Sequence, residues 1–306
     1  MVPMRHLSVG ATLAAALTLA ACGDPIATGT GPASQAPVAT PTTVATCATG
    51  SLSTDGSSAI KALIQKAADQ YQANCPGASI TVAATNSSTG VTKAATGAVD
   101  IGDSDVPAGL VQGVDASSIV DHHVAIVLFD VVVNNAAGVS ALTAQQVRDI
   151  FSGHTTNWSQ VGGANLPIAV FERTAGSGTR FTFDRDIMQG ANETTNPAQV
   201  INTSQTVVQS MSTTPGAIAY LTNSSVAASG GLVAVKIDNH SPSAANVAGG
   251  TYPFFSHEHC FTKPTPSLLA LSFLQYIRSA SFQMGALTSL GYLPLSTTTR
   301  LAAVDR

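Results

Sequence analysis

The sequence predicts an α/β protein, and two observations carry that prediction. After about residue 46, short β-type runs alternate with segments in which apolar residues recur at helical spacing. Hydrophobic residues make up 44% of the 306 positions, enough to build a sizeable core in one large domain or in two lobes. No motif recurs at a period of 20–50 residues, which argues against a solenoid.

The first half of this region reads as strand, helix, strand, helix and strand. The first helix is indicated by apolar residues three or four positions apart: Ile60, Leu63, Ile64, Ala67 and Tyr71. Around it we expect a strand at residues 51–54, a second strand at 80–84, a turn at 86–88, a short helix near 91–95 and a short strand at 100–102.

The second half continues the alternation, starting with a longer strand at residues 124–133. Thr143 is suited to cap a helix that buries Val147, Ile150 and Phe151, and Gly153 is placed to end it. A strand at 168–171 then runs into a Gly-rich loop and another helix, and the last helix spans about residues 267–279.

The N-terminus has the features of an export signal. Arg5 and His6 precede a short, Ala-rich apolar run, residues 7–21, which ends in a small-residue cleavage site directly before Cys22. This arrangement resembles the lipobox of bacterial lipoproteins, so we expect a signal peptide at residues 1–21 and lipidation of Cys22. An ordinary signal peptide with an incidental cysteine is the alternative. We expect residues 22–46, which are rich in Pro, Thr, Ala and Gly, to form a flexible tether.

Three cysteines remain after Cys22, and an exported compartment permits disulfides. Cys47 lies just before the first predicted strand and Cys75 just after the first predicted helix. Because these two points return to the same edge of a strand–helix unit, we expect a Cys47–Cys75 disulfide. Cys260 would be left over as a buried thiol.

The charge pattern argues against a nucleic-acid partner. The formal net charge is -4, charged residues make up only 10% of the chain, and Lys and Arg form no cluster or basic amphipathic helix. A low charge content with many Ser, Thr, Asn, Ala and Gly residues is typical of an exported protein.

Three strand-to-helix turns combine glycine with hydroxyl side chains, at residues 56–58, 87–90 and 176–179. Glycine lets the backbone approach a ligand, and a helix N-terminus offers unpaired N–H groups with a partial positive charge. An anion is the natural ligand for such turns, although ordinary helix capping explains any single one of them.

Four motifs resemble those of the phosphate-binding proteins of ABC importers, the PstS-like branch of the periplasmic binding proteins, and the resemblance covers most of residues 50–295. The motifs, in the order of the family, are IFSG–TNW–VGG at residues 150–163, RTAGSGTR at 173–180, TPGAIAY at 214–220 and GYLPL at 291–295.

The resemblance implies a type II periplasmic-binding-protein fold, with two lobes joined by two hinge crossovers. Lobe I would comprise residues 47–129 and 254–306, and lobe II residues 130–253. The implied function is to capture inorganic phosphate between the lobes and deliver it to the permease subunits of an ABC importer, without catalysis or a cofactor. We expect a monomer, exported and held at the cell membrane by its lipid anchor alone, facing the periplasm or the cell exterior.

The family's binding residues transfer motif by motif onto the following positions of this sequence: Ser58, the backbone of Ala59, Ser87, Asp105, Arg173, Ser177, Gly178 and Thr179. Arg173 would bind a tetrahedral oxyanion through two N–H groups. Asp105 would select phosphate, because an ionised carboxylate only accepts hydrogen bonds and sulfate has no proton to donate. Many members carry an acid at the position of Ala175, and its absence would leave Arg173 more strongly cationic.

Two other classes of function remain open. The protein could bind another oxyanion, such as sulfate, molybdate or tungstate, or it could be an exported phosphate sensor or phosphatase-like protein. Ser177 does not match the G-x-S-x-G nucleophile elbow. The two histidines of residues 257–260 lie on one strand face, but no second cluster in the sequence completes a metal site, so we expect no metal.

Overall fold

The computed structural model of the chain describes residues 47–298, and the signal peptide, Cys22 and the tether lie outside this range. Strands and helices alternate as expected, which confirms the α/β class. Within residues 47–298, none of the helices has both the length and the apolar character needed to cross a membrane.

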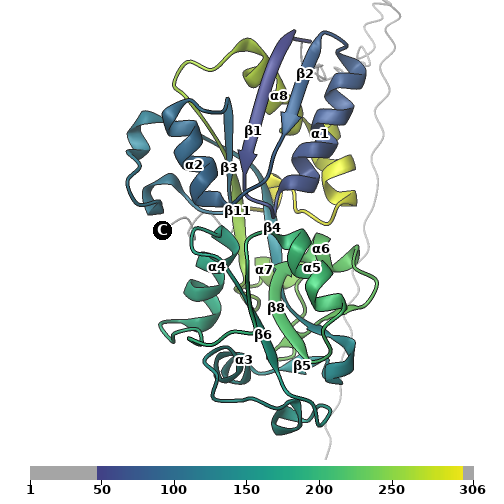
Figure 1. The fold of residues 1–306 in the computed structure, drawn as a ribbon. Helices are drawn as coiled ribbons and strands as arrows, with labels where there is room; N and C mark the ends of the chain where they lie inside the picture. The colour runs from purple at the N-terminus through teal and green to yellow at the C-terminus, as the bar shows by residue number, and fades with distance from the viewer. Residues whose placement is uncertain (1–46, 299–306) are drawn as a thin grey trace, which may run out of the picture. The chain divides into compact units, whose positions relative to one another are not determined.

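A nine-stranded sheet organises the structure, in the order β2-β1-β3-β11-β4-β8-β6-β7, with β9 paired to β4 off this path and β5 and β10 forming a separate pair. The strands are β1 (Gly50–Gly56), β2 (Ala78–Val82), β3 (Ile101–Ser104), β4 (Val120–Asn134), β5 (Ala141–Leu142), β6 (Ala169–Arg173), β7 (Gln199–Ile201), β8 (Ala217–Thr222), β9 (Leu232–Ala234), β10 (Lys236–Ile237) and β11 (Phe255–Thr262). Figure 1 shows β1, β2 and β3 at one end of the sheet and β6 and β8 at the other.

The sheet contains two groups of parallel strands. In the first strand group, β1 pairs in parallel with both β2 and β3. In the second strand group, β6 pairs in parallel with both β7 and β8. Because helices connect the parallel strands, the carboxyl ends of each group carry the strand-to-helix turns that the sequence singles out.

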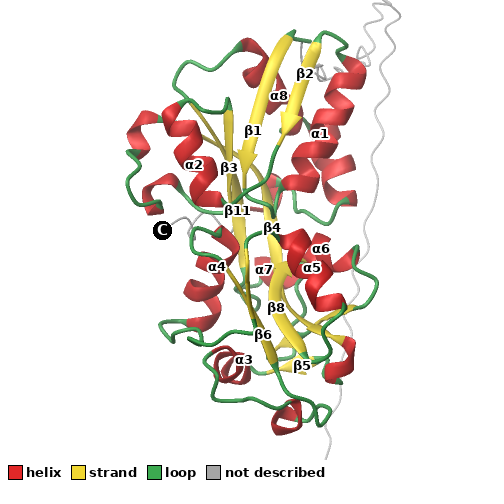
Figure 2. Cartoon of the chain, in the orientation of Figure 1, coloured by secondary structure: helices red, strands yellow, loops and turns green. Residues whose placement is uncertain are grey.

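β4 and β11 connect the two strand groups. They run antiparallel, and β11 also pairs with β3. β4 pairs with β11 as far as Leu128 and with β8 from Phe129 onward. Both long strands therefore pass between the groups beside each other, as Figure 2 shows. The exact lobe boundaries remain a prediction.

The helices are α1 (Lys61–Asn74), α2 (Ser87–Thr96), α3 (Ala144–Phe151), α4 (Gly178–Phe183), α5 (Ser204–Ser212), α6 (Asn223–Ala227), α7 (Ala244–Ala248), α8 (Leu268–Ile277) and α9 (Ala280–Phe282). Thr143 caps α3 as predicted, since its side chain accepts a hydrogen bond from the amide of Gln146. The second helix starts earlier than expected, at Ser87, because Asn86 rather than a later residue supplies its N-cap.

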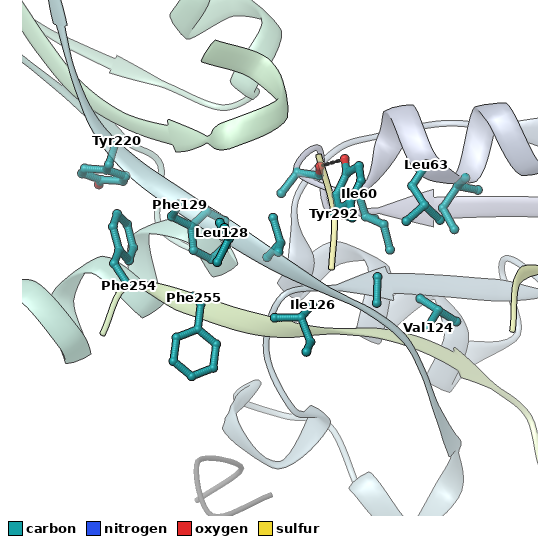
Figure 3. Close-up of a cluster of buried hydrophobic side chains, with 14 of the residues drawn as sticks. Ile60, Leu63, Val124, Ile126, Leu128, Phe129, Tyr220, Phe254, Phe255 and Tyr292 are labelled. Carbon is teal, nitrogen blue, oxygen red and sulfur yellow. Dashed lines mark hydrogen bonds between the residues drawn. The ribbon is translucent and has the colours of Figure 1, made fainter. Parts of the chain in front are cut away.

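The apolar core is continuous along β4 and β11. Figure 3 shows Ile126, Leu128 and Phe129 of β4 beside Phe254 and Phe255. The rings of Phe129 and Phe254 lie 5.1 Å apart, at the point where β4 changes its pairing partner. The core thus fills the region through which both connecting strands pass.

Cys47 and Cys75 form the disulfide expected from their positions, with their Cα atoms 5.3 Å apart. Cys260 is a buried free thiol, and its Sγ lies 3.3 Å from Oδ1 of Asp103. Both expectations for the cysteines of the described chain are confirmed.

Candidate functional site

The carboxyl ends of β1, β3 and β6 carry the charged and hydroxyl side chains of the candidate site. Ser57 and Ser58 follow β1, Asp105 follows β3, and Arg173 is the last residue of β6. A Cβ atom at Gly56 would lie 2.0 Å from the carbonyl oxygen of Asp103, so only glycine allows β1 to end this close to β3. This close approach places Ser57 beside Asp105.

The Asp105 carboxylate accepts hydrogen bonds from both sides of the site. Ser57 Oγ donates to one oxygen, and Thr179 Oγ1, from helix α4 after β6, donates to the other at 2.9 Å. The amide of Asp105 donates to Ser87 Oγ at 3.1 Å. Ser87, Asp105 and Thr179 are each only 1% exposed, so these bonds are made away from bulk water.

Burial raises the pKa of Asp105, and this effect outweighs the hydrogen bonds from Ser57 and Thr179 and the positive charge of Arg173, which lower it. Glu258 of β11 adds a second acid to the same region. Burial, together with the neighbouring Asp105 and Asp103, raises the pKa of Glu258 well above its ordinary value. The site thus contains several carboxyl groups and one guanidinium in a low-dielectric environment.

The Arg173 guanidinium is held by oxygen atoms from three segments. Its Nη2 donates to Ser58 Oγ at 3.2 Å and to the carbonyl of Asn202, its Nη1 donates to Ser204 Oγ at 3.3 Å, and its Nε donates to the carbonyl of Ile201 at 3.2 Å. Ser58 Oγ also accepts from the amide of Ser204 at 3.1 Å. Arg173 is only 2% exposed, and these hydrogen bonds fix its side chain in one orientation.

The charge of Arg173 is balanced only at a distance. Burial lowers the pKa of its guanidinium, while the charge of Asp105 acts in the opposite direction. Within residues 47–298, the structure contains no ion pair between Arg173 and a carboxylate, and the position two residues further along the chain is Ala175. The direct partners of this guanidinium are thus neutral oxygen atoms.

The loop after β6 contacts the N-terminal end of α2. Ser177 Oγ caps α4 by accepting from the amide of Arg180, and the amide of Ser88 donates to the carbonyl of Gly176 at 3.0 Å. A cavity of about 460 Å³ lies beside this loop, and Ser177 and Gly178 contribute to its wall, whereas Arg173 and Asp105 do not. The cavity therefore borders the hydrogen-bonded centre rather than containing it.

The residues selected from the sequence fall into two neighbouring hydrogen-bonded groups. Ser58 lies with Arg173, and Ser87, Gly178 and Thr179 lie with Asp105. The amide of Ala59 donates to Ser57 Oγ at 3.0 Å, and Ser177 contributes the cap of α4. Adjacent residues Ser57 and Ser58 connect the two groups.

Three parts of the site were not predicted from the sequence: Ser57 as the partner of Asp105, Ser204 and Glu258. Ser204 begins α5 behind its cap Thr203, so the same hydroxyl-rich strand-to-helix signal was present at residues 202–204. Glu258 carried no local signal, because only the pairing of β11 with β3 brings it near Asp105.

The site combines a guanidinium and several hydroxyl donors with a carboxylate acceptor. Such a set suits a small oxyanion that retains a proton, since the anion can accept from the donors and donate to the acid. Its buried position would exclude bulk water from such an anion.

A family model described as the PBP superfamily domain matches residues 39–281. The phosphate-binding protein PstS of Bacillus subtilis (strain 168) is 39% identical over 251 residues, which cover 81% of this chain and 82% of that protein.

Two solved structures share the fold. One is a putative phosphate ABC transporter substrate-binding protein with bound phosphate from Clostridium perfringens, with a TM-score of 0.73, 25% identity, and coverage of 80% of this chain and 100% of that one. The other is an ABC-type phosphate transport receptor from Vibrio cholerae, with a TM-score of 0.62, 23% identity, and coverage of 79% and 99%.

These matches define the class: a two-lobed binding protein with the type II periplasmic-binding-protein fold. Within the PBP superfamily, the chain belongs to the family of the PstS phosphate-binding proteins.

Proposed function

We propose that this chain captures inorganic phosphate between its two lobes and delivers it to the permease subunits of an ABC importer. Relatives named as phosphate-binding and phosphate ABC transporter proteins support this proposal. The observation that carries it is the placement of one guanidinium, Arg173, and one carboxylate, Asp105, in adjoining hydrogen-bonded groups at the ends of β6 and β3.

The carboxylate of Asp105 accounts for selectivity. Its two oxygens have about four lone-pair positions, of which the hydrogen bonds with Ser57, Thr179 and Glu258 use three, so capacity remains for one hydroxyl of the ligand. Phosphate keeps a proton near neutral pH and donates it to this acceptor. Sulfate would place an unprotonated oxygen against a buried acid, a mismatch worth discrimination of roughly 10⁴-fold.

The ligand would draw together lobe I, residues 47–129 and 254–306, and lobe II, residues 130–253. The Arg173–Ser58 and Thr179–Asp105 hydrogen bonds already run between these two parts of the chain. An anion that adds further contacts on both sides favours the closed arrangement by that difference in contacts. The closed surface would then be the one that the permease recognises.

In this proposal the protein is exported, is lipidated at Cys22, and works as a monomer outside the cytoplasmic membrane. The leader pattern of residues 1–21 and the Cys47–Cys75 disulfide support export to an oxidising compartment. Mass spectrometry of the membrane fraction tests the anchor, since lipidation adds acyl mass to an N-terminal peptide that begins with Cys22.

Calorimetry of the protein with phosphate, sulfate, molybdate and tungstate tests the ligand. We expect tight binding of one phosphate per chain and weak binding of sulfate. Arg173→Lys should weaken phosphate binding by about 10- to 100-fold, because the lysine ammonium keeps the positive charge but cannot donate two parallel hydrogen bonds in the bidentate manner of a guanidinium. Preferential binding of another anion, or unchanged affinity in Arg173→Lys, would refute the proposal. Release of phosphate from an ester that Ser177→Ala abolishes would indicate an enzyme instead.

A further inference from the structure

Histidines are concentrated on the two connecting strands. Four of the seven in the chain, His122, His123, His257 and His259, lie on β4 and β11. In the antiparallel ladder His259 is directly opposite His123, and Phe261 is opposite Asp121. Because alternate residues of a strand face the same side and opposite residues share a face, Asp121, His123 and His259 lie together on one side of the ladder.

The side-chain atoms of these three residues converge. His259 Nδ1 lies 2.8 Å and His123 Nε2 3.3 Å from Oδ2 of Asp121. One ligand atom from each residue falls within 4.8 Å of the others. In tetrahedral Zn²⁺ sites, where the bonds are about 2.0–2.1 Å long, the ligand atoms lie about 3.3 Å from one another. Small side-chain rotations would bring the ligand atoms of Asp121, His123 and His259 to this spacing.

We propose that Asp121, His123 and His259 form a binding site for a divalent transition-metal ion such as Zn²⁺. Two imidazole nitrogens with one carboxylate oxygen suit Zn²⁺, Ni²⁺ or Cu²⁺, whereas Mg²⁺ and Ca²⁺ prefer oxygen ligands alone. The side chain of His259 is 2% exposed, while those of His123 and Asp121 are 37% and 36% exposed. The ion would be reached from solvent and would keep a water ligand at its open position.

The surroundings prepare these groups to act as ligands. Ring nitrogens of His259 and His123 both lie against the same oxygen of Asp121, Oδ2, so the three potential ligand atoms already face a common point. His257 stacks on His123 at a ring separation of 5.3 Å, and Phe261 stacks on His259 at 5.5 Å. These contacts restrict the orientation of both imidazole rings, as neighbouring groups do in metal sites.

The ion would join β4 to β11 next to the shift in their register between Glu258 and His259. An ion that binds the folded chain and not the unfolded one raises the free energy of unfolding by RT ln(1 + L/Kd), where L is the free ion concentration. The inference is independent of phosphate binding, because none of the three residues belongs to the Asp105 and Arg173 groups.

The test is calorimetry with ZnCl₂ in phosphate-free buffer at pH 7.5, on protein without a polyhistidine tag. We expect one ion per chain and a rise in melting temperature with Zn²⁺ but not with Mg²⁺. His123→Gln and Asp121→Asn should each weaken Zn²⁺ binding by at least about tenfold, since each removes a ligand. His122→Gln is the matched control: His122 is adjacent on β4 but bonds to Thr262 Oγ1 at 3.0 Å, so its variant should bind Zn²⁺ as the parent does.

Phosphate binding and far-ultraviolet circular dichroism establish that each variant is folded. The inference is overturned if the parent protein gives no Zn²⁺ binding up to millimolar concentration, or if folded His123→Gln keeps the parent affinity. It is equally overturned if His122→Gln loses as much affinity as His123→Gln, because the ion would then be held elsewhere.

Discussion

At Gly178, one added methyl group should clash with residues of the proposed site. A Cβ atom there would lie 2.4 Å from Ser87 Oγ and 2.7 Å from Asp105 Cβ. Ser87 and Asp105 are both buried, and Asp105 is fixed by hydrogen bonds, so neither can move away freely. Gly178→Ala should therefore push α4 away from the first strand group.

Overpacking by one methyl group typically costs about 1–3 kcal/mol. The clash exists only where α4 meets Ser87 and Asp105, so the cost appears in the binding free energy rather than in the stability of the separate lobes. At about 1.4 kcal/mol per factor of ten, phosphate affinity should fall by about 5- to 140-fold.

Gly109→Ala supplies the control for this prediction. Gly109 lies in the short 3₁₀ turn Ala108–Leu110, and a Cβ atom there would meet no atom within 4 Å. Calorimetry with phosphate and thermal melts without phosphate should be measured for both variants. Wild-type affinity in Gly178→Ala would refute the reasoning, and so would a loss of unliganded stability as large as the loss of binding free energy.

Three further predictions concern selectivity, pH and redox state. Asp105→Asn should reduce the discrimination against sulfate by about 100-fold, measured as the ratio of the two dissociation constants, because the carboxamide can also donate; an unchanged ratio would contradict the role of Asp105. Burial raises the pKa of Asp130 to about 7, although Asn223 donates to it. The folded protein keeps the Asp130 carboxyl protonated up to about pH 7, whereas in the unfolded chain this group ionises near its ordinary pKa of about 3.9. The free energy of unfolding therefore falls as the pH rises between these two values. Asp130→Asn should therefore make the fall in unfolding free energy between pH 4 and pH 8 shallower by roughly 2–4 kcal/mol in denaturant titrations, and parallel curves would be evidence against it. Reduction of Cys47–Cys75, whose residues are 28 positions apart, should lower the unfolding free energy by about 3–4 kcal/mol in melts with and without reductant; a Cys47→Ser variant that still responds to reductant would point to another cause.

Local signals predicted much of the fold. The disulfide followed from the positions of Cys47 and Cys75 around one strand–helix unit, and the cap at Thr143 followed from the residues beside it. Asp105 and Arg173 could be selected because each lies at the end of a strand within a recognisable motif.

Features that depend on strand pairing could not be read from the sequence. Ser204 reaches Arg173 only because β7 pairs with β6, and the three residues of β7 are too few to give a periodic pattern. The partners of His259 were missed for the same reason: they come from β4, and their register depends on an irregularity at Glu258. Long-range register is set by packing and not by local propensity.

In the lipid-anchored protein proposed above, the Cys47–Cys75 disulfide has a mechanical consequence. Traction on the residues before Cys47 would pass covalently to the end of α1 as well as to β1, which starts three residues later at Gly50. The hydrogen bonds that pair β1 with β2 and β3 then cannot break one after another from the N-terminal end of β1, because the disulfide keeps Cys47 beside Cys75. In oxidising surroundings this end of the domain should withstand pulling, and a reductant would turn it into the place where forced unfolding starts.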